Sequence, residues 1–234
     1  GTLWRRTNSR AIDTKPFADQ LSLTGAFQTG ALRHSYSAGV EYSEEKSSKG
    51  SYVLGGGGTN NPLTGNQACA TTGAATGYNC TDFANPNPHD PWAATHPVTR
   101  SDKALDIEQT TVTKSVYAFD TIELSERWLL NLGLRWDDFD TEQVTPVAGA
   151  APTVIGNADT FLNYQAGVVF KPTANGSVYL SWGTSSTPPG MDSGEGNDAI
   201  SAANAELEPQ QTRNLELGTK WDLLAGRMNL TAAI

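Results

Sequence analysis

The connections between the predicted strands of this chain alternate strictly in length, and this alternation limits the folds that the chain can adopt. Alternating apolar and polar residues predict strands with a period of two, at residues 18–29, 32–43, 110–123, 127–139, 160–171, 177–184, 210–223 and 227–234. Short turns of three to five residues alternate with long connections at 44–109, 140–159 and 185–209. An antiparallel meander with these connections has every tight turn at one end and every long loop at the other.

This asymmetry is typical of transmembrane β-barrels, whereas a sandwich with Greek-key connections has no reason to keep it. The fold class predicted is therefore all-β, an antiparallel transmembrane β-barrel meander. A closed barrel of eight strands and a half-solvated soluble sheet are the alternatives.

The stretch "RWLLNLGLRWDDF" at 127–139 shows which face of such a sheet is apolar. Its polar set includes Asn131, Gly133, Arg135 and Asp137. The alternate residues form an apolar set that begins at Trp128 and ends at Trp136. These eight residue steps correspond to about 26 Å along a strand and, because the strand is tilted, about 20 Å along the membrane normal. This is close to the apolar band of about 25 Å between aromatic girdles. We therefore expect the apolar set to contact lipid: Trp128, Leu130, Leu132, Leu134 and Trp136.

One strand does not show clear faces. In strand 110–123, Tyr117 and Phe119 alternate with Val116, Ala118 and Ile122, so both sets contain large apolar residues. The pattern alone does not assign its two faces.

Composition excludes several other classes. The 234 residues contain no run of 18 apolar residues, so no transmembrane helix is expected. The first ten residues show no apolar core or cleavage pattern of a signal peptide. The net charge of −9 argues against nucleic acid as a partner.

Three stretches of the chain resemble TonB-dependent outer-membrane receptors. "KSVYAFDTIELSERWLLNLGLRWDDFDTE" at 114–142 is similar to a barrel hairpin of that family, and "LEPQQTRNLELGTKWDLLAGRMNLTAAI" at 207–234 is similar to its "E-x-G-x-K" strand and the following hairpin. "VYLSWGTSSTPPG" at 178–190 most resembles the catecholate-type siderophore receptors. The resemblance covers about residues 18–43 and 110–234.

This resemblance implies a bacterial outer-membrane importer of ferric siderophores. Such receptors have a plug inside a barrel of roughly 22 strands and are energised by a TonB-type inner-membrane partner that engages the N-terminal part. The chain contains about eight or nine strands and no plug, so residues 1–234 are expected to be a partial barrel domain. Its expected partners are the ferric siderophore, the TonB-type protein, and outer-membrane lipid and lipopolysaccharide. A passive channel or a structural surface barrel is the alternative function.

The candidate binding residues lie in the long loop at 44–109. Siderophore recognition needs aromatic surfaces and cationic donors at the outside mouth, and this loop offers Tyr52, Tyr78, Trp92 and Arg100. Each of them could instead simply pack its own loop. The acidic loop at 185–209 has no lysine or arginine, which is unfavourable for an anionic ferric catecholate unless divalent cations screen it.

An even pair of cysteines, Cys69 and Cys80, in an outer-membrane loop predicts a disulfide that closes a short ring. On the chain-entropy model such a bridge would stabilise the loop by roughly 3 kcal/mol.

No catalytic or metal site is predicted. His34, His89 and His96 do not have the spacing of a compact ligand set, and the family carries its iron inside the siderophore, so no cofactor is expected. No Ser/His/Asp or paired-carboxylate arrangement recurs on one strand face or in one short loop, so the protein is not expected to be an enzyme.

Overall fold

The computed structural model describes residues 2–5, 10–54, 79–82, 84, 98–191 and 200–234. The chain forms two compact units. The first comprises Gly1–Asp13, Ser48–Glu108 and Thr145–Thr153, and the second comprises Thr14–Ser47, Gln109–Val144 and Val154–Ile234.

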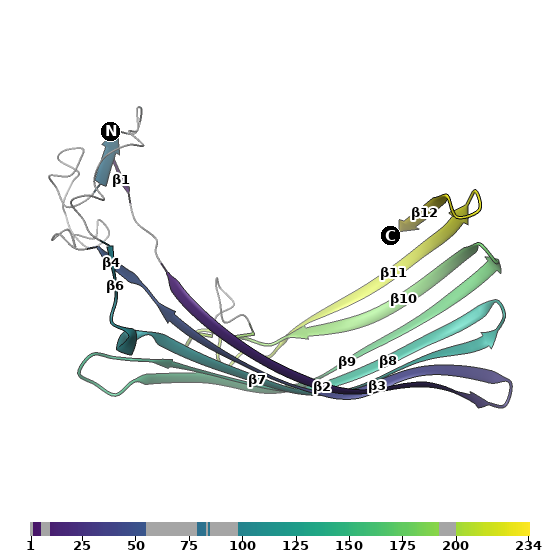
Figure 1. The fold of residues 1–234 in the computed structure, drawn as a ribbon, viewed down its shortest axis with the longest axis horizontal. Coiled ribbons are helices and arrows are strands. Elements are labelled where there is room, and N and C mark those ends of the chain that lie inside the picture. Colours follow the sequence, from purple (N-terminus) through teal and green to yellow (C-terminus); the bar gives the residue numbers. More distant parts are fainter. Residues whose placement is uncertain (1, 6–9, 55–78, 83, 85–97, 192–199) are drawn as a thin grey trace. The chain divides into compact units, whose positions relative to one another are not determined.

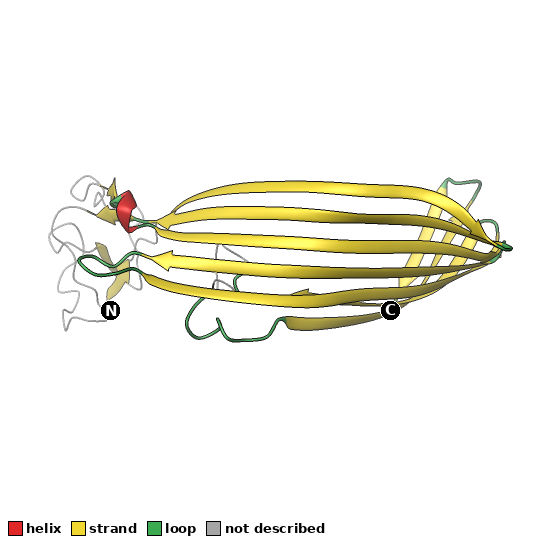
Figure 2. Ribbon diagram, turned by 90° about the horizontal axis from the view of Figure 1, so that it is seen from below, coloured by secondary structure: helices red, strands yellow, loops and turns green. Residues whose placement is uncertain are grey.

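Eight strands form one antiparallel sheet, with each strand beside its neighbour in chain order (Figures 1 and 2). They are β2 (Ala11–Thr29), β3 (Leu32–Gly50), β7 (Ile107–Ser125), β8 (Trp128–Thr145), β9 (Thr153–Thr173), β10 (Gly176–Thr187), β11 (Gln210–Leu223) and β12 (Met228–Ala233). The predicted all-β meander is therefore confirmed. Within the described residues, β2 and β12 are the two edges of the sheet. The closed eight-stranded barrel is thus not the arrangement of this chain.

Two small sheets accompany the large one. β1 (Thr2–Arg5) pairs with β5 (Asn79–Asp82), and β4 (Tyr52–Leu54) pairs with β6 (Val98–Arg100). A single turn of 3₁₀ helix, η2, covers Lys103–Leu105, and the Ala104 backbone N–H donates to the Asp102 carboxylate at 3.0 Å. No helix in the described part of the chain is long and apolar enough to cross a membrane.

Most strands are longer than the sequence pattern predicts. The region 140–159, predicted as a long loop, is mostly strand, because β8 ends at Thr145 and β9 begins at Thr153. Similarly, β3 continues from residue 43 to Gly50 through "SEEKSSKG". These extensions are polar or have no regular apolar alternation, so they lack the pattern from which strands are predicted. At 18 to 21 residues, β8 and β9 exceed the roughly 9–11 residues that a tilted strand needs to cross a bilayer.

The sheet has one apolar face and one polar face. On β8, the exposed fractions of Leu132 and Leu134 are 41% and 49%, whereas Asp137 and Phe139 on the other face are 4% and 1% exposed. All five residues predicted to face lipid lie on the apolar face. A row of large apolar side chains without a cover is unusual for a face in contact with water. This favours contact with lipid, which stays a prediction.

Aromatic rings form two rows on the apolar face, which is the arrangement of membrane-interface girdles. Each row contains ring pairs between neighbouring strands, with centroids 4.6–6.2 Å apart. The row nearer the long loops contains the pairs Phe17–Tyr42 and Tyr164–Trp182, and the row nearer the short turns contains Trp128–Phe170 and Phe27–Tyr36.

The structure assigns the faces of β7, which the sequence left open. Tyr117 and Phe119 lie on the polar face, where each ring covers a glycine of the neighbouring strand. A Cβ atom at Gly39 would lie 2.7 Å from the Tyr117 hydroxyl, and one at Gly133 would collide with the Phe119 ring. Large rings thus occupy the polar face because glycines leave room for them to lie against the sheet.

Replacing Gly133 with alanine should therefore destabilise the full-length receptor. The new methyl group must displace Phe119, and overpacking of this kind costs about 1–3 kcal/mol. Gly183→Ala is the matched control, because a Cβ there would lie 3.6 Å from the Gln165 Cβ atom, an ordinary contact. Denaturant unfolding of both variants in lipid vesicles measures the difference, and equal stabilities would contradict the covering role of Phe119.

Candidate functional site

A cluster of paired charges occupies the polar face of β3, β7 and β8. The Arg135 guanidinium donates to the Asp137 carboxylate at 2.9 Å and contacts the Glu41 carboxylate at 3.2 Å. It also donates to the Ser115 hydroxyl at 2.7 Å, and this hydroxyl donates to Asp137 at 2.6 Å. One guanidinium is thus shared by two carboxylates, and the cluster links β3, β7 and β8 while its net charge stays negative.

The connection between β10 and β11 is attached to the same face at two points. The Gln109 amide donates to the Gly190 carbonyl at 2.9 Å, and the Asn157 amide donates to the Ala205 carbonyl at 2.9 Å. Ile200 is buried, as are Gln109 and Thr141. A Cβ atom added at Gly190 would lie 2.9 Å from both Ile200 and Thr141, so this connection packs directly against the polar face of the sheet.

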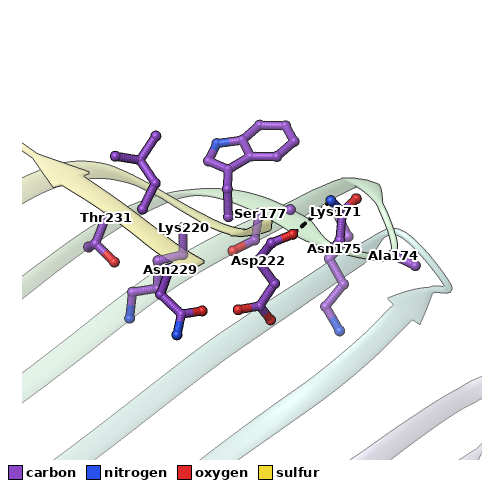
Figure 3. Close-up of a pocket in the computed structure, with 11 residues that line it drawn as sticks. Lys171, Ala174, Asn175, Ser177, Lys220, Asp222, Asn229 and Thr231 are labelled. Atoms are coloured by element: carbon purple, nitrogen blue, oxygen red, sulfur yellow. Dashed lines mark hydrogen bonds between the residues drawn. The ribbon is translucent and has the colours of Figure 1, made fainter. Parts of the chain in front are cut away.

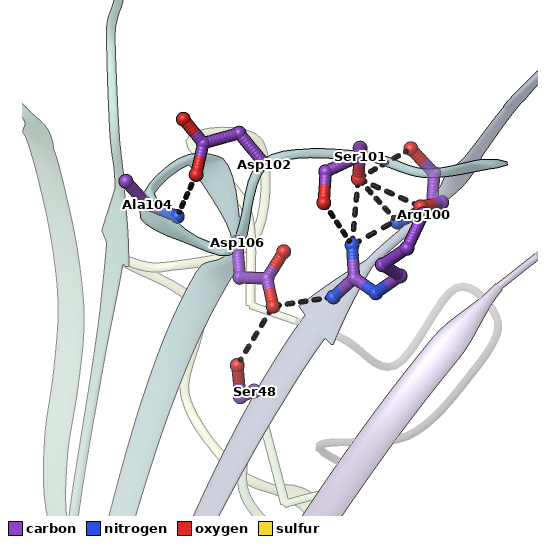
Figure 4. Close-up of polar contacts among 7 residues, drawn as sticks. Ser48, Arg100, Ser101, Asp102, Ala104 and Asp106 are labelled. Carbon is purple, nitrogen blue, oxygen red and sulfur yellow. Dashed lines mark hydrogen bonds and ion pairs between the residues drawn. The ribbon is translucent and has the colours of Figure 1, made fainter.

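Arg100, at the end of β6, is the centre of a second polar network (Figure 4). Its guanidinium forms a 2.6 Å ion pair with Asp106, whose side chain is only 6% exposed. The same guanidinium donates to the Ser101 hydroxyl at 2.6 Å and to the Ser51 carbonyl at 3.1 Å. Asp106 also accepts a hydrogen bond from the Ser48 hydroxyl at 3.3 Å.

Gly50 allows this network to form. A Cβ atom there would collide with both the Arg100 guanidinium and the Asp106 carboxylate. The network therefore ties the end of β3 to the segment between β6 and β7. It thereby links the two ends of the connection between β3 and β7, which is the longest connection of the chain.

The structure brings two of the four candidate binding residues together. The Cα atoms of Tyr52 and Arg100 are paired across β4 and β6, and the Tyr52 side chain is exposed. Arg100, in contrast, points its guanidinium at protein acceptors, which gives it a structural role. Tyr78 and Trp92 lie outside the described residues. The contribution of all four residues to ligand binding remains a prediction.

The predicted disulfide is also outside the described part of the chain, because Cys69 is not described. Cys80 is described through its backbone, which lies in β5 with its Cα atom paired to that of Trp4. Among the described residues, no three His, Cys, Asp or Glu side chains are close enough to hold a metal ion together. His34 is instead paired with Asp120 on the apolar face, with 2.6 Å between Nδ1 and Oδ2.

The sequence pattern did not identify the Arg135 cluster or the attachments of the β10–β11 connection. A usable signal for the cluster existed, because Arg135 and Asp137 are two residues apart in a strand and must share a face. Glu41 and Gln109 carry no such signal, since their partners are 94 and 81 residues away in sequence.

Comparison with known proteins shows which family the chain is similar to. The model of the TonB dependent receptor-like β-barrel family matches residues 2–234. The probable TonB-dependent siderophore receptor PiuA of Acinetobacter baumannii is 41% identical over 238 residues, which cover 100% of this chain and 31% of that protein. The catecholate siderophore receptor Fiu of Escherichia coli O6:H1 is 30% identical over 257 residues, covering 99% and 30%.

Solved structures show the same fold. The crystal structure of PiuA from Acinetobacter baumannii matches with a TM-score of 0.82 and 38% identity, covering 100% of this chain and 33% of that one. The closed form of the ferric-catecholate import receptor Fiu from Escherichia coli K12 matches with a TM-score of 0.70 and 27% identity, covering 96% and 31%. The chain therefore spans about three-tenths of the length of these relatives.

Proposed function

Because the chain belongs to the TonB-dependent receptor β-barrel family, we propose that it forms part of the wall of an outer-membrane receptor that imports ferric siderophores. The similarity to PiuA and Fiu over essentially the whole chain carries this proposal. Since Fiu is named as a catecholate receptor, a ferric catecholate is the proposed substrate. The barrel lies in the bacterial outer membrane, as the family's barrels do.

The two faces of the sheet support this function. The apolar face with its aromatic rows suits lipid. Lys114 and Asp138, each two residues from an apolar residue of this face (Val116 and Trp136), form an ion pair with 3.6 Å between Nζ and Oδ2. The polar face suits a water-accessible barrel interior. With the short turns on the periplasmic side, the long connections between the strands face the outside, where a ligand arrives.

The partners follow from this assignment. The proposed receptor binds a ferric siderophore, contacts lipid and lipopolysaccharide through its apolar face, and is energised by a TonB-type protein that engages the part of the receptor beyond this chain. Iron enters inside the siderophore, so the proposal needs neither a resident cofactor nor a catalytic step. The β10–β11 connection contributes Glu206 and Glu208 and no cation between residues 185 and 209, so the positive contacts for an anionic chelate must come from elsewhere in the receptor.

Uptake by iron-starved cells that carry the full-length receptor tests the proposal. Radiolabelled ferric catecholate should accumulate against its gradient, and an uncoupler should abolish this accumulation, because a static barrel cannot perform work. Cells carrying the empty vector are the control. Uptake that persists with the uncoupler and rises linearly with outside concentration would instead identify a passive channel.

A further inference from the structure

A cavity lies at the short-turn end of the sheet, opposite to the end that carries the long connections. It has a volume of about 390 Å³ and is formed by β9, the β9–β10 turn, the start of β10, β11 and β12. Small-molecule sites typically fall in the range of roughly 300–1,000 Å³. The side chains of Lys171, Asp222 and Asn229 extend to the same side of the strands (Figure 3).

Most polar side chains of this cavity can donate hydrogen bonds. Two ammonium groups line it, those of Lys171 and Lys220, together with the Asn229 amide and the hydroxyls of Ser177 and Thr231. Asp222 contributes the single carboxylate among the described residues that line the cavity. Two cations against one acid give the cavity a positive balance in a chain whose net charge is −9.

Neither ammonium is neutralised by an ion pair within the described residues. Lys220 lies over the Tyr179 ring, with its Nζ atom 5.4 Å from the ring centroid. This differs from the Arg135 cluster on the same face, where the guanidinium is shared by two carboxylates. As far as the described residues are concerned, both ammonium groups are available for an anion.

The walls of the cavity are held in place by hydrogen bonds between Asn175 and Asp222 and by the packing of Trp221 on Gly176. The Asn175 amide donates to the Asp222 carbonyl at 2.9 Å, and the Asp222 N–H donates to the Asn175 carbonyl at 2.8 Å. Gly176 has no side chain, so the Trp221 ring packs against it, and a Cβ atom there would collide with this ring. The β9–β10 turn is thus fixed against β11, and the two lysines are presented by a preformed frame.

We propose that this cavity is a second binding site for the anionic iron chelate, at the periplasmic end of the barrel wall, with Lys171 and Lys220 as its cationic contacts. The inference rests on the proposed function. After capture at the outer mouth, the chelate would be held here by charge before its release into the periplasm. The site therefore contributes to the rate of transport through the receptor and not to the initial binding of the chelate from outside.

The decisive variant is the double substitution Lys171→Gln and Lys220→Gln in the full-length receptor. The matched control is Arg127→Gln with Arg227→Gln, which removes two cations from the same end of the sheet without changing the residues that line the cavity. Two quantities are measured with a gallium catecholate, which is redox-inert, and its ferric counterpart. They are the equilibrium affinity of the purified receptor and the saturation curve of uptake in energised cells.

We expect the lysine variant to keep its capture affinity within about twofold and to lose about five- to tenfold in maximum uptake rate, as the loss of two exposed charge contacts implies. The control should retain both quantities. Saturating gallium catecholate should also protect Lys171 and Lys220, but not Lys103, from acetylation. Unchanged uptake by the lysine variant would overturn the second site.

Cross-linking with a carbodiimide, which joins lysines to neighbouring carboxylates, tests whether another part of the receptor occupies the cavity. If Lys171 or Lys220 becomes linked to a carboxylate of the receptor outside residues 1–234, polypeptide fills the cavity and the proposal is wrong. Failure of the wild-type receptor to bind the catecholate at all would instead contradict the proposed function. The two failures are thus distinguishable.

Discussion

Replacing Leu132 with arginine should lower the free energy of unfolding of the full-length receptor by about 2–4 kcal/mol, the cost of a cation near the middle of the lipid-facing band. Leu132 lies midway between Trp128 and Trp136 on the apolar face and is 41% exposed in the isolated chain. Arginine at this position would place a guanidinium in hydrocarbon unless it reached one of the interfaces. Unfolding by guanidinium chloride in phospholipid vesicles measures the loss.

The control for this experiment must be a residue on the polar face that has space around it. Ser181→Arg is suitable, because Ser181 lines a cavity of about 320 Å³ together with Asn131 and Gln165. It should cost clearly less than Leu132→Arg. Asn131 is less suitable, since it accepts a 2.8 Å hydrogen bond from Thr121, and Gly133 is covered by Phe119. Equal losses at Leu132 and Ser181 would contradict the assignment of the apolar face to lipid.

Replacing Arg100 with methionine should loosen the segment from β6 to the start of β7 by about 3–5 kcal/mol, the cost of leaving one partner of a buried ion pair uncompensated. Asp106 is 5% exposed and would keep only the Ser48 hydroxyl as a side-chain partner. Backbone amides between residues 98 and 108 should exchange with deuterium correspondingly faster, and hydrogen exchange of the full-length receptor without ligand measures this.

The double variant Arg100→Met with Asp106→Asn separates a structural role from a ligand-binding one. It removes both charges, so it should recover much of the lost protection. Arg100→Lys should give an intermediate result, because one ammonium can neutralise Asp106 but cannot also reach the Ser51 and Ser101 acceptors. If Arg100→Met left exchange unchanged but abolished siderophore affinity, Arg100 would be a ligand residue and not a brace.

The sequence by itself determined the class of the fold. Strand alternation is a local property of the backbone, because successive side chains point to opposite faces. The series Trp128 to Trp136 therefore revealed an apolar face without any knowledge of neighbours, and the lengths of the connections ordered the strands into a meander. The same argument fails where apolar and polar residues do not alternate, which is why residues 140–145 and 153–159 were predicted as loop and proved to be strand.

The tertiary structure alone decided which residues act together. The faces of β7 depended on Gly39 and Gly133, which belong to other strands and make room for Tyr117 and Phe119. Arg100 was predicted from its charge as a ligand contact, but its guanidinium is held by Asp106 and by the Ser51 carbonyl, and the second of these contacts spans 49 residues of sequence. Lys171 and Lys220 lie 49 residues apart, and only the pairing of β9 through β11 brings them to one cavity. Pairing between strands is set by contacts over long sequence separations, and no local pattern encodes these contacts.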